Sequence, residues 1–217
     1  MRRWLFVPVV YLCLGASGSV RADSLVPGST VSPMSSGSVS GSIVADTGIM
    51  GYTLLAGAKT KGTGTIRELV VSGDSSNPYH GLTFIYQVSG VSTGDIARLT
   101  GDLYTGFKTD VIVAGSGIVP TGADRSTLAA DGGDTVGFNF TPKLDPGESS
   151  ALLIVRTDAP HLQTGDIGLI DGGQASLPGF SPLPEPSTLV IFGLQMFGLG
   201  AFLIRRRMKT SNLFQLA

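Results

Sequence analysis

Cysteine and histidine are almost missing from the 217-residue chain, and charged residues make up only 14% of it. The single cysteine, Cys13, lies in the first apolar stretch, so residues 23–217 can form no internal disulfide. The only histidines are His80 and His161. Two distant histidines without cysteine are too few ligands for a typical zinc site, which uses three or four. The composition therefore excludes disulfide scaffolds and disfavours zinc chemistry.

Basic residues are also scarce between the two ends of the chain. Seven of the 15 lie at the termini, and residues 23–182 hold 15 acidic against 8 basic groups. An acidic surface repels phosphate backbones, so we expect no nucleic-acid partner. What is abundant is glycine, 31 residues, together with serine, threonine and valine. This composition favours an extracellular β protein, because turns need glycine and half-buried strands favour β-branched side chains.

The first 22 residues have the pattern of a secretory signal peptide. Arg2 and Arg3 precede an apolar stretch at residues 4–14, which is too short to span a bilayer by itself. Leu12 before Cys13 does not match a bacterial lipobox, which has a small residue there. Small residues follow, and we expect signal peptidase to cut between Ala22 and Asp23 after export through the Sec translocon.

An uncharged apolar stretch occupies residues 187–204, near the other end. Its eighteen residues would form a helix of roughly 27 Å, close to the hydrocarbon thickness of a membrane. Arg205, Arg206 and Arg207 follow and stop transfer, and positively charged flanks stay in the cytoplasm. The pattern predicts one transmembrane helix with the preceding domain outside and residues 210–217 as a cytoplasmic trailer.

The C-terminal segment at residues 183–209 contains, in this order, Leu183-Pro184-Glu185-Pro186-Ser187, the apolar span and the arginine run. It resembles a PEP-CTERM sorting signal. The resemblance implies a Gram-negative, exopolysaccharide-producing source, and it implies exosortase as the membrane enzyme that recognises and removes the tail at Pro184-Glu185-Pro186. The two prolines favour extended backbone that does not join the following helix. The chain departs from the usual pattern in having ten residues after the arginines.

The middle of the chain shows short apolar runs bounded by turn residues. Residues 82–88 and 136–140 alternate apolar with polar or small side chains, which predicts strands, and the continuous apolar run at residues 151–155 predicts a central strand buried on both faces. Further strands are expected at residues 51–55, 65–72, 96–104, 109–113 and 166–170. No stretch has a sustained helical period.

These strands predict an all-β fold, an antiparallel β-sandwich of jelly-roll-like type, over residues 43–175. We expect a flexible Ser/Gly-rich leader at residues 23–42 and a Pro-rich spacer at residues 176–182. The sequence segments at residues 81–87, 104–111, 145–150 and 155–159 resemble, in their order, a domain common among proteins with this sorting tail. That resemblance implies an extracellular β domain and supplies no catalytic residues.

Candidate catalytic residues are few and poorly placed. A nucleophilic triad needs a base, and both histidines fall in expected turns or loops. Ser116, in Gly115-Ser116-Gly117, lacks the Gly-x-Ser-x-Gly spacing. Glu148 lies in a Pro-Gly turn and Glu68 in an expected strand, and both are interpreted as solvated side chains. We therefore expect no catalysis.

Two binding functions stay open at the level of sequence. Asp124, Asp131 and Asp134 form a weak calcium candidate, because hard cations need clustered oxygen ligands on a loop, although a polar turn explains the pattern better. Tyr79, Tyr86 and Tyr104 would offer a sugar-stacking platform, but Tyr86 falls on the apolar face of its strand.

The sequence thus predicts a non-enzymatic surface protein without a cofactor. It is exported by Sec, anchored in the inner membrane with its domain in the periplasm, and then passed to the envelope or exopolysaccharide layer. A carbohydrate- or calcium-binding module is the first alternative, and a secreted hydrolase is the second.

Overall fold

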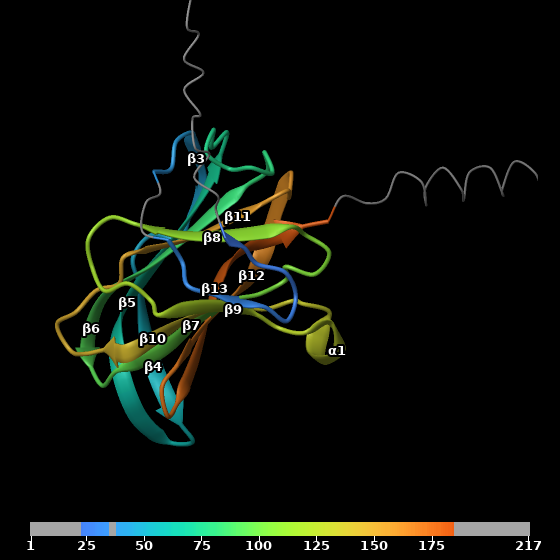
Figure 1. The fold of residues 1–217 in the computed structure, drawn as a ribbon. Coiled ribbons are helices and arrows are strands. Elements are labelled where there is room, and N and C mark those ends of the chain that lie inside the picture. The colour runs from blue at the N-terminus through green and yellow to red at the C-terminus, as the bar shows by residue number, and fades with distance from the viewer. Residues whose placement is uncertain (1–22, 35–37, 185–217) are drawn as a thin grey trace, which may run out of the picture.

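The chain folds into antiparallel strands in a computed structural model that describes residues 23–34 and 38–184 (Figure 1). The predicted all-β class is confirmed. These residues contain thirteen strands and one short helix: β1 (Asp23–Ser24), β2 (Thr30–Val31), β3 (Ser42–Asp46), β4 (Met50–Ala56), β5 (Lys59–Ser72), β6 (Thr83–Thr93), β7 (Ile96–Gly101), β8 (Thr109–Ala114), β9 (Gly122–Arg125), α1 (Leu128–Asp131), β10 (Val136–Leu144), β11 (Leu152–Thr157), β12 (His161–Ile170) and β13 (Gln174–Leu183).

The apolar alternation of the sequence marks the strand faces that form the main core. Phe84, Tyr86 and Val88 of β6 are buried, as the period of two predicts. In β11, successive side chains Leu153 and Ile154 are both fully buried. This strand lies between β8 and β6 and is covered on both faces, so the predicted central strand is confirmed.

One continuous path of hydrogen-bonded neighbours joins the strands in the order β1-β8-β11-β6-β5-β4-β13-β12-β7-β10-β9-β2, and β3 pairs with β5 off this path. The fourteen-residue β5 is the longest strand. It pairs with β6 along most of its length, with β4 over its first part and with β3 over its last part. Register shifts near Thr63 and Thr65 mark irregular pairing along β5, and such irregularities bend a strand.

The expected flexible leader at residues 23–42 is wrong in part, because its first residues belong to the sheet. β1 pairs with β8 at one end of the path, and β2 pairs with β9 at the other end. Between them Leu25 is only 1% exposed, and its backbone N–H donates to Thr109 O at 2.8 Å. Residues 23–31 therefore connect the two ends of the path.

The Pro-rich spacer at residues 176–182 and the domain boundary at 175 are also wrong. β13 pairs with β12 over ten consecutive positions, from Gln174 opposite Ile170 to Leu183 opposite His161. Pro178 and Pro182 lie within this strand. On the other side β13 pairs with β4 at one position only, Gln174 opposite Leu55. Because most of that edge forms no ladder, the missing N–H groups of the prolines cost little.

Both halves of the path contribute to one core. Phe84 and Leu153 from β6 and β11 belong to the same buried cluster as Leu99 and Ile167 from β7 and β12. The Phe84 and Tyr104 rings meet edge to face, with centroids 5.9 Å apart. A smaller apolar cluster covers the other face of β5, β6, β8 and β11, where Val39 packs against Val71, Ile85, Ile112 and Ile154.

The predicted signal peptide (residues 1–22), the helix at residues 187–204 and the trailer at residues 210–217 lie outside the described residues. Within the described ranges, no helix has both the length and the apolar character needed to cross a bilayer. α1, with four residues, begins at the Thr127 cap and ends at Gly132 in a left-handed conformation.

Candidate functional site

The end of β13 is where the predicted sorting signal meets the folded domain. The last strand ends at Leu183, and Pro184, the first residue of the tripeptide, follows directly with an exposed side chain. Glu185, Pro186 and Arg205, Arg206 and Arg207 lie outside the described residues. The structure thus describes Leu183 and Pro184 of the predicted signal, and only the first residue of its Pro-Glu-Pro tripeptide.

Pro184 lines a surface hollow of about 390 Å³. The other lining residues come from two loops, one before β8 and one between β11 and β12: Thr105, Gly106, Phe107, Asp158 and Pro160. The Lys108 backbone N–H donates to the Asp158 carboxylate at 2.9 Å and joins the two loops. The chain therefore leaves the last strand beside a surface whose loops are tied together.

The buried side chain of Arg125, on β9, anchors the loop before β8. Its guanidinium donates from Nη1 to Phe107 O at 2.9 Å and from Nε to Gly133 O at 2.7 Å, and a further bond reaches Tyr104 O. Nη1 also lies 3.5 Å from Leu25 O. Sequence reasoning missed Arg125, because a strand of four residues gives no usable period, and the carbonyl groups that it binds are distant in sequence.

The predicted signal-peptidase site lies at the other boundary of the described domain. Asp23 is the first residue of β1 and pairs with Val111 of β8, whereas Ala22 lies outside the described residues. Leu25 bonds to Thr109, and Pro184 lies beside Thr105, Gly106 and Phe107. The first and last segments of the described domain therefore both contact residues 105–109.

The calcium candidate Asp124, Asp131 and Asp134 is not assembled. Both carboxylate oxygens of Asp124 accept hydrogen bonds from Arg98, and Asn139 also donates to this group. The Asp131 carboxylate accepts the backbone N–H groups of Gly133 and Asp134 at 3.1 Å and so holds the turn after α1. In the described part of the chain, no group of three or more His, Cys, Asp or Glu residues is placed to hold a metal ion.

The tyrosine platform is wrong as well. Tyr86 and Tyr104 are 1% and 0% exposed, and their hydroxyl groups hydrogen-bond to each other at 2.8 Å inside the core. Burial raises the pKa of both phenols. Only Tyr79 of the three retains partial exposure. The expectation that Tyr86 belongs to the core is confirmed.

The remaining candidate catalysts are exposed or hold turns. His80 is exposed in the turn before β6, and its φ of 61° lies in the left-handed region. His161 is the first residue of β12 instead of a loop residue, and Ser116 is exposed in the loop after β8. Glu148 Oε2 accepts the Asp145 backbone N–H at 2.8 Å, which closes the Pro-Gly turn.

Glu68 is not solvated, as the sequence interpretation had it, but fully buried. Its Oε2 accepts the Phe180 backbone N–H at 2.8 Å, so this carboxyl joins β5 to β13. The pKa of Glu68 is raised to about 8, chiefly by burial; the Phe180 and Tyr86 hydrogen bonds oppose this rise and the neighbouring Asp102 adds to it. The signal was present in the sequence, because Glu68 shares a strand face with Ile66 and Val70.

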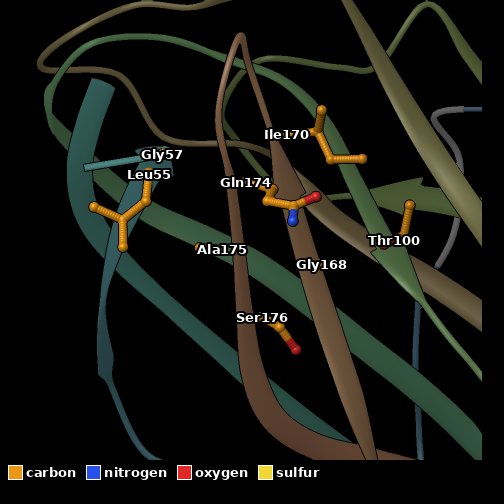
Figure 2. Close-up of a pocket in the computed structure, with 8 residues that line it drawn as sticks. All are labelled: Leu55, Gly57, Thr100, Gly168, Ile170, Gln174, Ala175 and Ser176. Carbon is orange, nitrogen blue, oxygen red and sulfur yellow. The ribbon is translucent and has the colours of Figure 1, made fainter. Parts of the chain in front are cut away.

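A second hollow, of about 540 Å³, lies over the outer face of β12 and its neighbours (Figure 2). Gly168 on β12 lies directly opposite Ser176 on β13 and Thr100 on β7. The hairpin ends contribute Leu55, Ile170 and Gln174. The lining includes no charged side chain. Sequence reasoning placed a strand here but missed the hollow, because the hollow depends on β4, β7 and the β12–β13 hairpin, which are distant from one another along the chain.

Comparison with known proteins adds no relative: no family model, no curated protein and no solved structure matches this chain.

Proposed function

We propose that the chain is an exported envelope protein, sorted through its PEP-CTERM-like tail. In this proposal Sec exports the chain, signal peptidase cuts after Ala22, and the span at residues 187–204 holds the protein in the inner membrane with its domain in the periplasm. Exosortase then processes Pro184-Glu185-Pro186, and the domain passes to the envelope or the exopolysaccharide layer.

The observation that carries the proposal is the position of Pro184. It is exposed and follows the last residue of β13 directly. A processing enzyme needs backbone that is accessible and outside a ladder, and Pro184 meets both conditions. A cut after Ala22 and a cut within the tripeptide would together leave every described strand in place. The domain and its two processing signals are therefore separable.

For the domain itself we propose a jelly-roll-like β-sandwich with a non-catalytic role. Support comes from how its buried polar groups are used. Glu68 accepts a backbone hydrogen bond from β13, and Arg125 donates to three loop carbonyl groups. Arg156 lies 3.5 Å from the Asp74 carboxylate and 3.7 Å from that of Asp110. Each of these groups holds strands or loops together.

Replacing Pro184, Glu185 and Pro186 with alanine tests the sorting proposal in a host that encodes an exosortase. The variant is expected to accumulate as a membrane-bound precursor, whereas the parent chain loses its tail. The measurement is the mass of the protein in membrane and released fractions. Alanine replacement of Thr210, Ser211 and Asn212 in the trailer is the matched control and should be processed normally. Release of the tripeptide variant at the parent rate would refute the proposal.

A further inference from the structure

The hollow over Gly168 presents hydrogen-bonding groups that no residue in the described part of the chain uses. The side chains of Thr100, Gln174 and Ser176 line it, and within the described residues none of the three has a hydrogen-bond partner. Figure 2 shows Gln174 on the Ile170 side of the hollow and Ser176 lower along β13. Two hydroxyl groups and one carboxamide offer both donors and acceptors to a ligand.

The absence of a side chain at position 168 creates the space between these groups. A Cβ at Gly168 would lie only 2.3 Å from Thr100 Oγ1. The cross-strand neighbours on both sides, Ser176 and Thr100, are short. The hollow of about 540 Å³ is within the usual size range of small-molecule sites, roughly 300–1,000 Å³.

Two exposed aliphatic side chains supply the apolar part of the hollow. Leu55 is 46% exposed and Ile170 is 42% exposed, and they come from the ends of different hairpins. A ligand with C–H groups on one face and hydroxyl groups around its rim would cover these side chains and bind the free polar groups at the same time.

The uncharged lining of the hollow favours a neutral ligand. Arg98, a charged residue on the neighbouring strand, is the cross-strand partner of Ile170. Its guanidinium is bound by the Asp124 carboxylate, and Asn139 completes this network. A charged ligand would therefore find no free counter-charge in the lining.

We propose that this hollow binds a neutral saccharide, one or two sugar units of a polysaccharide. Sugars combine hydroxyl groups with an apolar C–H face, which matches the three free polar side chains and the two aliphatic walls. The proposed binding site is argued from the geometry of the hollow alone. That the sugar comes from an envelope polysaccharide rests on the proposed function.

Saturation-transfer NMR on the full chain tests the inference, with the protein held in a detergent that has no sugar headgroup. The probes are cellobiose and N,N′-diacetylchitobiose, with digalacturonic acid as the charged comparison. At least one neutral disaccharide is expected to bind, and to bind more tightly than the charged one. Gln174→Ala and Ser176→Ala should each weaken binding about threefold to tenfold, the usual effect of one hydrogen bond.

Thr164→Ala is the matched control, because Thr164 is exposed on the same face of β12 and lies outside the hollow. Its affinity should equal that of the parent chain. No binding of either neutral disaccharide, equal affinities in the hollow variants, or tighter binding of digalacturonic acid would overturn the inference. If the tail variant is released normally and saccharide binding is observed, the sorting proposal fails and this inference stands.

Discussion

The carboxyl of Glu68 shows how a single side chain connects two distant strands. It lies in the core with Tyr86 and Tyr104, and its Oε2 accepts the Phe180 N–H. Burying a charged carboxylate is costly, so the neutral form is favoured in the folded domain. The folded-state pKa of about 8 lies above the ordinary value of 4.5.

Glu68→Gln is therefore expected to remove a pH dependence of stability. Because the folded-state pKa is raised, the parent domain is most stable with respect to this group below about pH 4.5, and it loses stability as pH rises towards 8. The loss should be on the order of 3 kcal/mol between pH 5 and pH 8.5 and should largely vanish in the variant. Urea unfolding at the two pH values measures it.

Asp166→Asn is the control for this comparison, since Asp166 is exposed on β12. It should keep the pH dependence of the parent domain. The carboxyls of Asp46, Asp74, Asp124 and Asp131 have lowered pKa values, so they stay ionised over this pH window and do not mimic the effect. An equal loss of stability in Glu68→Gln and in the parent domain would contradict the assignment.

The alternation of apolar and smaller side chains was enough to predict several strands. It was not enough to predict whether a polar side chain is buried or exposed. Phe138 and Phe140 alternate with smaller residues, and both are buried as expected. Glu68 lies on the same face of β5 as Ile66 and Val70, yet its charge suggested that it is exposed to solvent. Its burial is made possible by a hydrogen bond from the Phe180 N–H, which is 112 residues away in the sequence. A local sequence pattern cannot predict such a distant partner.

At the scale of elements, β13 marks the limit of what local patterns predict. Pro178 and Pro182 suggested a spacer, because proline removes a ladder hydrogen bond in a central strand. β13 tolerates both because it pairs with β12 along its whole length and with β4 at Gln174 alone. Whether a strand edge is paired is a property of the assembled sheet, so residues 176–182 alone could not reveal it.

Truncation separates the two interpretations of this segment. A chain of residues 23–183 is expected to keep the near-ultraviolet circular dichroism and the melting temperature of the parent domain. A chain that ends at Gly173 should lose cooperative unfolding, because Ile167 and Leu169 lose the covering strand and Glu68 loses its hydrogen-bond donor. A cooperative transition in the shorter chain would show that β13 is dispensable.

At the scale of the whole molecule, residues 23–31 join the two ends of the strand path. β1 and β2 have two residues each, so their strand pairing alone contributes little stability to the connection. The connection depends on Leu25, which is buried in the common core, and on the Thr109 hydroxyl, which donates to Leu25 O at 2.6 Å. The Ser/Gly-rich sequence around residues 23–31 suggested a flexible leader, because one apolar residue between turn residues shows no strand or helix period.

Leu25→Ala tests whether this connection stabilises the domain. Removing a buried leucine side chain leaves a cavity and typically costs 2–5 kcal/mol, so we expect a loss of about 3 kcal/mol in urea unfolding. Val26→Ala is the matched control, because Val26 is 56% exposed and should change stability by less than about 0.5 kcal/mol. Equal effects of the two substitutions would show that residues 23–31 contribute nothing to the core.

The same connection has a consequence for the order of events during synthesis. Residues 23–31 leave the ribosome early, yet the Thr109 and Arg125 contacts of Leu25 span 84 and 100 residues. The Glu68 contact with Phe180 closes only when the last strand is present. Folding that depends on such distant contacts is slow, because loop closure precedes the stabilising contacts. We therefore expect the nascent chain to stay unfolded until nearly all of the domain has been made, and the export proposed above would require such an unfolded chain.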